Sequence, residues 1–168
     1  MTDFAVRAAE RRDLPELLAI YNHYVVNTPI TFDLEPRTLA QRLEWLDGFA
    51  TTGKYRCFVA LRNDRPIGWS CSARFKDKAA YDTSVETSVY LAPNETGKGL
   101  GRRLYQTLFD SLASEDIHRA FGGVTLPNDA SVGLHKTLGF EHAGTYREIG
   151  RKFGKYWDVA LFLRHLNS

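Results

Sequence analysis

Three glycines alternate with other residues in the segment Thr96-Gly97-Lys98-Gly99-Leu100-Gly101, which joins an apolar stretch to a helix-like stretch. Glycine lets a backbone come close to a ligand without a steric penalty, because it has no Cβ atom. The first turn of a helix adds unpaired N–H groups and a partial positive charge. The segment is therefore expected to bind an anion, most naturally a phosphate or pyrophosphate group.

The spacing of these glycines fits neither of the two common nucleotide motifs. A P-loop needs a lysine followed by serine or threonine, whereas Lys98 is followed by Gly99. A dinucleotide fingerprint opens the first βαβ unit of a chain, whereas this loop comes late, after strands that read as antiparallel. The glycine loop therefore predicts a phosphate-containing ligand of another kind.

The stretches around this loop predict one mixed α/β domain. Apolar residues recur at helical spacing in stretches that we predict as helices beginning at Asp13, near Pro36, at Gly99 and after Asn128. Extended apolar runs predict strands at residues 4–7, 56–62, 67–75, 83–91, 120–126, 140–150 and 156–163. The order β-α-α-β-β-β-α-β-α-β-β indicates a mixed, mostly antiparallel sheet of about seven strands with about four helices on its faces.

Local signals mark the ends of these elements. Asp13 is predicted to cap the first helix, with Pro15 in the first turn and Glu16 three residues after the cap. Pro29 is predicted to end that helix, and Gly139 to end the helix that follows Asn128. Because no repeat or flexible linker interrupts the pattern, we expect a single domain over residues 1–168.

The composition points to no nucleic-acid or membrane partner. The formal net charge is +2 at pH 7, and the basic residues are scattered rather than clustered. No apolar stretch approaches the length of a membrane span, and the first residues lack the apolar core of a signal peptide. Cys57, Cys71 and the histidines lack the spacing of a metal site, so we expect no metal. Two free thiols predict a reducing compartment, and we expect a cytoplasmic protein.

The glycine loop resembles the pyrophosphate loop of the GCN5-related N-acetyltransferase (GNAT) superfamily. A second segment, Asn128-Asp129-Ala130-Ser131-Val132-Gly133-Leu134-His135-Lys136-Thr137-Leu138-Gly139-Phe140, resembles the Asn…helix…Leu-Gly-Phe segment of that superfamily. The separation of the two segments and the predicted strand order are also similar to those of the superfamily. The resemblance implies the GNAT fold and acetyl-CoA as the ligand.

A narrower resemblance covers nearly the whole chain. The segments Tyr21-Asn22-His23-Tyr24, Ala80-Tyr81-Asp82, Leu126-Pro127-Asn128-Asp129 and Gly150-x-Lys152…Trp157-x-Val159 are similar to those of phosphinothricin acetyltransferases. This resemblance implies acetylation of the α-amine of phosphinothricin, methionine sulfoximine or methionine sulfone, by a homodimer. Two positions differ from the superfamily pattern. Thr96 stands where Gln or Arg is usual, and His135 stands where many members have tyrosine.

The resemblance also implies where acetyl-CoA binds. The pyrophosphate is expected on the loop from Thr96 to Gly101, and Asn128 is expected to bind the pantetheine amide or to cap its helix. If the strands at 83–91 and 120–126 splay apart, an unpaired N–H, plausibly that of Val89, would stabilise the oxyanion. The expected acetyl-CoA contacts are Ser88, Val89, Tyr90, Thr96, Gly97, Lys98, Gly99, Leu100, Gly101, Asn128 and Ser131.

Acetyl transfer to an amine requires a base for the ammonium group and a proton for the departing thiolate. Glu86 is the candidate base, because strand alternation puts it on the face opposite Val85 and Val89, where partial burial would raise the pKa of its carboxyl group. His135 lies two helical turns beyond Asn128. It is the candidate proton donor, and a hydrogen-bonded core histidine is the alternative.

The basic segment Arg74-Phe75-Lys76-Asp77-Lys78-Ala79-Ala80-Tyr81 precedes the strand of Glu86 and is the candidate acceptor site. Arg74 or Lys78 would bind a carboxylate or phosphinate, although a solvated basic turn is the alternative. The expected acceptor contacts are Phe32, Arg74, Phe75, Lys76, Lys78, Tyr81, Val85, Glu86 and Thr87. Two other functions stay open: acetylation of a polyamine, aminoglycoside or protein amine, and acyl-CoA sensing without turnover.

Overall fold

Seven strands form one sheet in the order β1-β2-β3-β4-β5-β7-β6 in this computed structural model, which describes residues 3–167. The strands are β1 (Ala5–Ala8), β2 (Cys57–Arg62), β3 (Arg65–Arg74), β4 (Ser84–Leu91), β5 (Arg119–Thr125), β6 (Glu141–Lys152) and β7 (Lys155–His165). The helices are α1 (Leu14–Asn27), α2 (Leu39–Asp47), α3 (Leu100–Ser111) and α4 (Asp129–Thr137). The predicted mixed, mostly antiparallel sheet and its element order are confirmed.

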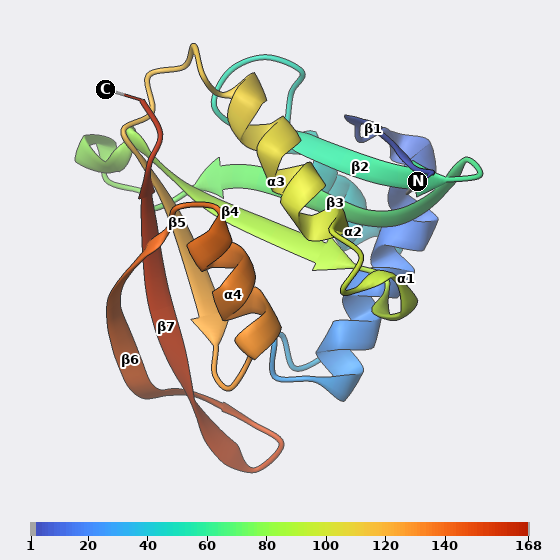
Figure 1. Ribbon diagram of the computed structural model, residues 1–168. Coiled ribbons are helices and arrows are strands. Elements are labelled where there is room, and N and C mark those ends of the chain that lie inside the picture. The colour runs from blue at the N-terminus through green and yellow to red at the C-terminus, as the bar shows by residue number, and fades with distance from the viewer. Residues whose placement is uncertain (1–2, 168) are drawn as a thin grey trace.

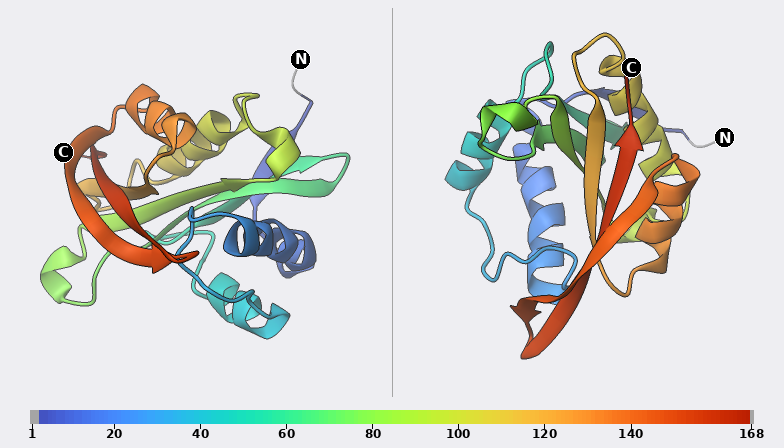
Figure 2. Two further views of the ribbon diagram at one scale, coloured as in Figure 1. Left: turned by 90° about the horizontal axis from the view of Figure 1, so that it is seen from below. Right: turned by 90° about the vertical axis from the view of Figure 1, so that its left-hand side faces the viewer.

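The helices cover both faces of the sheet. α1 and α2 lie on one face, and α3 and α4 lie on the other, as Figures 1 and 2 show. Among the described strands, β4 and β5 are the one parallel pair, and every other neighbouring pair is antiparallel. The parallel pair lies in the middle of the sheet, where the chain crosses from the first half of the sheet to the second.

A separate hydrophobic layer holds each pair of helices to the sheet. Leu108 of α3 and Leu112, the residue that follows α3, are fully buried in one cluster with Val85 of β4. On the other face, Leu17 of α1 packs against Trp69 of β3, which is 1% exposed. Burying one such side chain contributes about 1.5–3 kcal/mol, so the helical periodicity of the apolar residues accounts for both layers.

The predicted cap of α1 is wrong in its contacts. Asp13 precedes the helix as expected, but its side chain makes no capping hydrogen bond to α1. Its carboxylate instead accepts two hydrogen bonds from the Arg7 guanidinium, both at 2.8 Å, and one from the Glu10 N–H at 2.8 Å. A carboxylate that is 2% exposed gains more from a bidentate arginine than from a backbone N–H alone.

Other element ends lie close to their predicted positions. α2 begins at Leu39 rather than near Pro36, because Thr38 and Gln41 form a capping box. α4 is followed by Gly139, whose φ of +79° is the left-handed conformation expected at a helix end. The β2–β3 turn is tighter than predicted, since Asn63 and Asp64 both take positive φ and β3 begins at Arg65.

The C-terminal hairpin reaches back to the N-terminal half of the chain. β6 and β7 form a long twisted ribbon that extends below the rest of the molecule in Figure 1. The Lys152 Nζ atom, near the tip of this ribbon, donates a hydrogen bond of 2.8 Å to the Thr31 carbonyl oxygen. Gly150 lies directly against the Phe32 ring, and a Cβ atom at this position would collide with the ring. The hairpin thus fixes the loop between α1 and α2.

Candidate active site

The glycine loop has the conformation that its sequence requires. Gly97 and Gly99 have φ of +74° and +80°, and a Cβ atom built on either would meet nothing within 4 Å. α3 begins immediately after Gly99, and no side chain caps it. The first N–H groups of α3 therefore have no side-chain partner, which is the arrangement that binds phosphate groups at helix N-termini.

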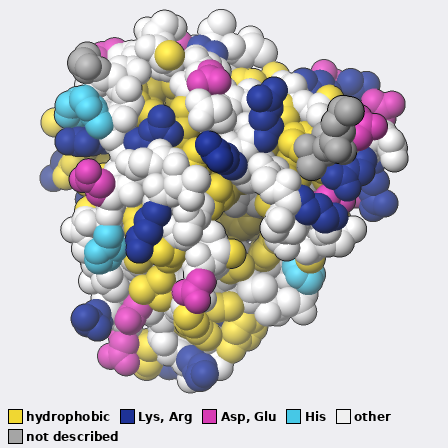
Figure 3. All heavy atoms as spheres, viewed as in Figure 1, with side chains coloured by type: hydrophobic (Ala, Val, Ile, Leu, Met, Phe, Trp, Pro, Cys, Tyr) yellow, Lys and Arg dark blue, Asp and Glu magenta, His cyan; other side chains and the backbone are white. Residues whose placement is uncertain are grey.

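A groove of about 440 Å³ runs from this loop along the start of α3 toward α4. Figure 3 shows it as a hollow near the centre of the face, with hydrophobic side chains inside it. Its lining residues are Tyr24, Ile30, Val89, Tyr90, Leu91, Thr96, Gly97, Gly99, Leu100, Gly101, Arg102, Asn128, Ala130, Ser131 and Leu134.

Most of the residues predicted to contact acetyl-CoA line this groove, with two exceptions. The Lys98 side chain is not part of the lining, and its Nζ atom lies 3.4 Å from a Glu95 carboxylate oxygen. Ser88 instead lines two adjoining cavities. Arg102 was missed by the sequence analysis, although a basic residue in the first turn after a phosphate-binding loop was the signal that could have identified it.

β4 and β5 splay apart, as predicted. Their pairing covers Ser84 to Glu86 on β4 and ends at Phe121 on β5. Beyond that point a narrow cavity of about 60 Å³ opens between the strands. Its lining residues are Ile30, Thr87, Ser88, Val89, Tyr90, Tyr105, Gly123, Val124, Thr125, Asn128, Ser131 and His135.

The backbone of β4 alternates between its two neighbouring strands. The Ala92 N–H donates to the Ile67 carbonyl oxygen at 2.8 Å, which fixes the phase of the β3–β4 ladder. Because antiparallel pairing alternates, Ser88 and Tyr90 exchange their backbone hydrogen bonds with β3, and Val89 directs its N–H toward β5. The backbone N–H that faces the strand gap is therefore that of Val89, as predicted. Ser88 and Tyr90 use their backbone groups in pairing with β3, so only their side chains can contact a ligand in the cavities.

Asn128 and Ser131 lie at the start of α4, where the groove and the narrow cavity meet. The Asn128 side chain caps α4 by accepting a hydrogen bond of 3.1 Å from the Ser131 N–H. This contact uses the carboxamide oxygen and leaves the amide NH₂ group free for another partner. The predicted cap and a ligand contact are thus compatible.

His135 lies in the core at the inner end of the narrow cavity and is 3% exposed. Its Nδ1 atom lies 2.7 Å from the Ser131 carbonyl oxygen, so Nδ1 carries the proton. Its Nε2 atom is buried without a hydrogen-bond partner among residues 3–167, and burial lowers the pKa of the ring. A neutral ring whose one N–H is already engaged fits the core alternative better than the proton-donor role.

Glu86 lies on β4 on the face opposite Val85, as predicted, but it is more exposed than expected. The small side chain of Ala73, its neighbour on β3, leaves it accessible. Surrounding protein still raises the pKa of the carboxyl group above its usual value, and the cause is desolvation. Within residues 3–167, the carboxylate forms no ion pair, so its charge is available to a ligand.

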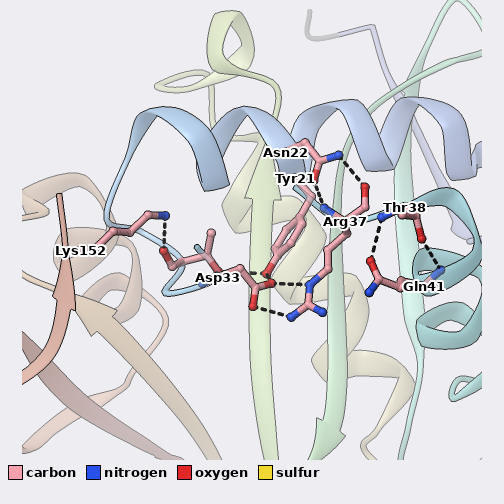
Figure 4. Close-up of polar contacts among 8 residues, drawn as sticks. Tyr21, Asn22, Asp33, Arg37, Thr38, Gln41 and Lys152 are labelled. Carbon is pink, nitrogen blue, oxygen red and sulfur yellow. Dashed lines mark hydrogen bonds and ion pairs between the residues drawn. The ribbon is translucent and has the colours of Figure 1, made fainter. Parts of the chain in front are cut away.

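A second cavity, of about 280 Å³, lies on the same face of the sheet as Glu86, beneath α1 and α2. A polar cluster forms one wall: Asp33 accepts hydrogen bonds from the Tyr21 hydroxyl and from Arg37 Nε, the latter at 2.9 Å (Figure 4). Hydrogen bonds from Arg37 hold the pKa of Asp33 below its usual value. The full lining is Tyr21, Asp33, Arg37, Gln41, Arg42, Trp45, Trp69, Cys71, Ser88 and Tyr90.

The sequence analysis assigned none of this second cavity's lining residues to the acceptor, and it assigned two of them, Ser88 and Tyr90, to acetyl-CoA. It predicted α1 and α2 from the helical spacing of their apolar residues and assigned none of their side chains to the acceptor site. Arg42 was the available signal, since a basic residue in the middle of an amphipathic helix next to Trp45 is an exception to that pattern.

The basic segment at 74–81 is an exposed patch beyond the N-terminal end of β4. Arg74, Phe75, Lys76, Lys78 and Tyr81 line a shallow depression there. Inside it, the Lys76 Nζ atom lies over the rings of Phe75 and Tyr81, at 5.2 and 5.1 Å from their centroids. The patch is next to Glu86 along the strand but separate from the cavity under α1 and α2.

The remaining predicted acceptor contacts include three residues that lie in different surroundings. Val85 is fully buried under α3, so it cannot touch an acceptor, and that prediction is wrong. Thr87 is 4% exposed, and its hydroxyl donates to the Phe121 carbonyl oxygen at 3.2 Å across the strand gap. Phe32 is 36% exposed and packs against Gly150 at the edge of the site.

The three cavities form one path through the sheet. The loop groove and the narrow cavity share Ile30, Val89, Tyr90, Asn128 and Ser131. The narrow cavity and the cavity under α1 and α2 share Ser88 and Tyr90. The cavity between β4 and β5 therefore adjoins both the glycine-loop groove and the cavity under α1 and α2, and Glu86 lies on the same face of the sheet as the latter without lining it. Within residues 3–167, no group of acidic, histidine or cysteine side chains could hold a metal ion.

Comparison with known proteins agrees with this geometry. The family described as "Acetyltransferase (GNAT) domain" matches residues 6–161. A phosphinothricin N-acetyltransferase from Streptomyces coelicolor is 51% identical over 163 residues, which cover 96% of this chain and 95% of the relative. An L-methionine sulfoximine/L-methionine sulfone acetyltransferase from Pseudomonas paraeruginosa is 32% identical, with 97% and 95% covered.

A solved structure shows the same fold. The phosphinothricin acetyltransferase of Sinorhizobium meliloti, determined in complex with acetyl-CoA, aligns with a TM-score of 0.92 and 30% identity. The alignment covers 99% of this chain and 90% of that one. With its splayed central strands, its glycine loop and these relatives, the chain belongs to the GNAT acetyltransferase family.

Proposed function

We propose that the protein transfers the acetyl group of acetyl-CoA to the α-amine of a small amino-acid-like acceptor of the phosphinothricin, methionine sulfoximine or methionine sulfone type. The observation that carries the proposal is the path from the glycine loop, through the gap between β4 and β5, to a face where Glu86 and cationic side chains lie. The acceptors named for the Streptomyces and Pseudomonas relatives support the substrate class.

The loop and groove fit acetyl-CoA. The open space around Gly97 and Gly99 and the uncapped start of α3 suit a pyrophosphate, and Arg102 adds a positive charge beside it. The Val89 backbone and the free amide NH₂ of Asn128 would hold the pantetheine arm. When bound, acetyl-CoA supplies an acetyl group already activated as a thioester.

Glu86 accepts a proton from the ammonium group of the acceptor, directly or through a water molecule. Its raised pKa brings it nearer to neutrality, where a general base is most effective. The Val89 N–H, which points into the strand gap, donates to the carbonyl oxygen as negative charge develops on it. His135 has a positioning role, because its Nδ1–H holds the first turn of α4 through Ser131.

The charges of the acceptor side favour an anionic amino acid over a polyamine or aminoglycoside. Arg37 and Arg42 line the cavity under α1 and α2, and Asp33, the carboxylate among its lining residues, is already paired with Arg37. The basic segment at 74–81 adds further positive charge. An exposed, unpaired Glu86 also fits turnover better than acyl-CoA sensing alone.

We also propose that the protein is a homodimer in the cytoplasm. The hairpin of β6 and β7 exposes Tyr146, Ile149, Phe153 and Tyr156, each more than half exposed. Large apolar side chains grouped on one element are typical of an association surface. The free thiols of Cys57 and Cys71 fit a reducing compartment. Light scattering on the purified protein tests the dimer: a mass of one chain at micromolar concentration would contradict it.

An acceptor screen tests the function. Release of free thiol from acetyl-CoA is measured with phosphinothricin, methionine sulfoximine, methionine sulfone, spermidine and an aminoglycoside. We expect turnover with the amino-acid-like acceptors and little with the polycations. Preference for a polycation would favour the other class of acetyltransferase. Acetyl-CoA binding with no thiol release on any acceptor would favour the sensor.

A further inference from the structure

The Arg42 guanidinium is buried among aromatic rings beneath α2. The residue is 5% exposed, and its Cζ atom lies 3.4 Å from the centroid of the Trp45 ring. The rings of Tyr21 and Trp69 lie at 4.6 and 4.8 Å. Aromatic faces attract a guanidinium, but they cover its planar faces and leave the N–H groups at its edge without acceptors.

Two of those nitrogen atoms have no hydrogen-bond partner among residues 3–167. Arg42 Nε and Nη2 are both buried without a hydrogen bond, and no ion pair among residues 3–167 includes Arg42. Burial lowers the pKa of the guanidinium. The neighbouring Arg37 uses the same Nε and Nη2 edge to hold the Asp33 carboxylate. Arg42 therefore presents the binding edge of an arginine without its carboxylate.

The position of Arg42 relates it to the proposed base. Arg42, Cys71 and Ser88 line the cavity under α1 and α2, and Glu86 lies two residues before Ser88 on the same face of β4. Burial raises the pKa of the Cys71 thiol to about 12, while the charge of Arg42 opposes this shift and that of Glu86 adds to it. Arg42 and Cys71 thus line the cavity itself, and Glu86 lies on the same face of the sheet, paired with Ala73 two residues along β3 from Cys71.

We propose that Arg42 is the anion subsite for the acceptor, binding an oxyanionic end of the substrate while its ammonium group faces Glu86. This inference rests on the proposed function and names a residue that the basic segment at 74–81 does not include. A buried charge without a counterion is unfavourable, so an incoming carboxylate or phosphinate gains a full charge-assisted hydrogen bond there. An amino-acid zwitterion carries the two charges that the pair of Arg42 and Glu86 complements.

The experiment measures acceptor binding without acetyl-CoA, through tryptophan fluorescence. Trp45 and Trp69 flank Arg42, so an anion at the guanidinium changes their emission. The variants are Arg42→Met, which keeps the length and removes the charge, and Arg42→Lys, which keeps the charge and loses the planar edge. Arg65→Met is the matched control, because Arg65 is exposed and pairs with Glu16 away from the cavity.

Three acceptors distinguish the source of the anion. Methionine sulfone carries only a carboxylate, decarboxylated phosphinothricin carries only a phosphinate, and decarboxylated methionine sulfone carries neither. We expect Arg42→Met to raise the Kd of at least one anionic acceptor about 10- to 100-fold, and Arg42→Lys to raise it less. The Kd of decarboxylated methionine sulfone is expected to stay within about twofold of the wild-type value. Arg65→Met is expected to change none of the three Kd values.

The outcomes are decisive in each direction. If Arg42→Met binds methionine sulfone more weakly than wild type does, Arg42 binds the carboxylate. If it binds decarboxylated phosphinothricin more weakly, Arg42 binds the phosphinate. Equal affinities of wild type and Arg42→Met for both anionic acceptors overturn the proposal. An equally large loss of affinity for decarboxylated methionine sulfone, which carries no anion, also overturns it. If Arg42→Met does not fold, the comparison of wild type with Arg42→Lys decides. Arg42-dependent binding without any acetylation would refute the proposed function and leave the subsite standing.

Discussion

Replacing Glu86 with glutamine tests the proposed base with little structural disturbance. The Glu86 side chain forms no ion pair among the described residues, and its backbone pairs with Ala73 through groups that glutamine also has. Because surrounding protein raises the pKa of this carboxyl group, its charged form is disfavoured in the folded state. Removing the charge should therefore leave the thermal stability at neutral pH unchanged or slightly higher.

The effect on turnover should be large. A positioned general base typically contributes about 10²- to 10⁴-fold, which corresponds to roughly 2.7–5.5 kcal/mol of activation free energy. We expect Glu86→Gln to lower kcat within this range. The KM for acetyl-CoA should stay near the wild-type value, since the proposed pyrophosphate loop begins beyond the far end of β4.

The pH dependence of kcat/KM also tests Glu86 as the base. The base works only when ionised, so wild-type kcat/KM should fall as the pH drops through the raised pKa of Glu86. The variant should be slow at every pH and lack this decline. Thiol release across pH 5 to 9 measures both, with Glu141→Gln, another exposed strand glutamate, as the control. Turnover within about threefold of wild type, or an unchanged acid decline, would remove Glu86 from the proposed role.

Three further predictions concern the loop and the core. Gly99→Ala and Gly53→Ala place alanine at nearly equal φ, +80° and +83°, with open space around each Cβ, so both should lose about 1–2 kcal/mol of stability. Only Gly99→Ala should raise the KM for acetyl-CoA; a similar rise in both would argue against the loop site. Asp13→Asn removes the buried carboxylate that pairs with Arg7. It should lower the free energy of unfolding, measured in urea at pH 7, by about 3–5 kcal/mol. Desolvation raises the pKa of Asp13, but the hydrogen bonds from Arg7 and the Glu10 N–H, together with the charges of Arg7 and Arg12, outweigh it and lower the pKa. The wild-type advantage should thus persist above the unfolded-state pKa and disappear as the pH falls through the folded one. Leu104→Ala, at a fully buried position of α3, should cost about 2–5 kcal/mol in the same assay, and a cost below about 1 kcal/mol would contradict its place in the core.

Local patterns were sufficient to predict the fold. The helical spacing of apolar residues in α3 and the alternation in β4 depend on neighbours along the chain, and both appear in the structure at nearly the predicted bounds. The glycine loop was predictable for the same reason, because positive φ at Gly97 and Gly99 is a local requirement. The gap between β4 and β5 was predicted only through resemblance to a family.

The contacts of individual side chains were less predictable, because they depend on distant segments. Asp13 was expected to cap α1, but Arg7 on β1 provides a stronger partner. Val85 was expected to contact the acceptor, but strand alternation places its side chain in the core. Arg42 was absent from the predicted site, since no pattern in α2 shows that Trp69, far along the chain, will cover its guanidinium.

The hydrogen bond from Lys152 to the Thr31 carbonyl oxygen joins residues that are 121 positions apart. A ribosome must therefore finish the C-terminal hairpin before the loop between α1 and α2 can be held in place. A nascent chain that ends before β6 already contains the glycine loop, α3 and α4, and hence all the elements around the acetyl-CoA groove. This topology therefore delays the assembly of the proposed acceptor side until β6 and the turn after it have been synthesised.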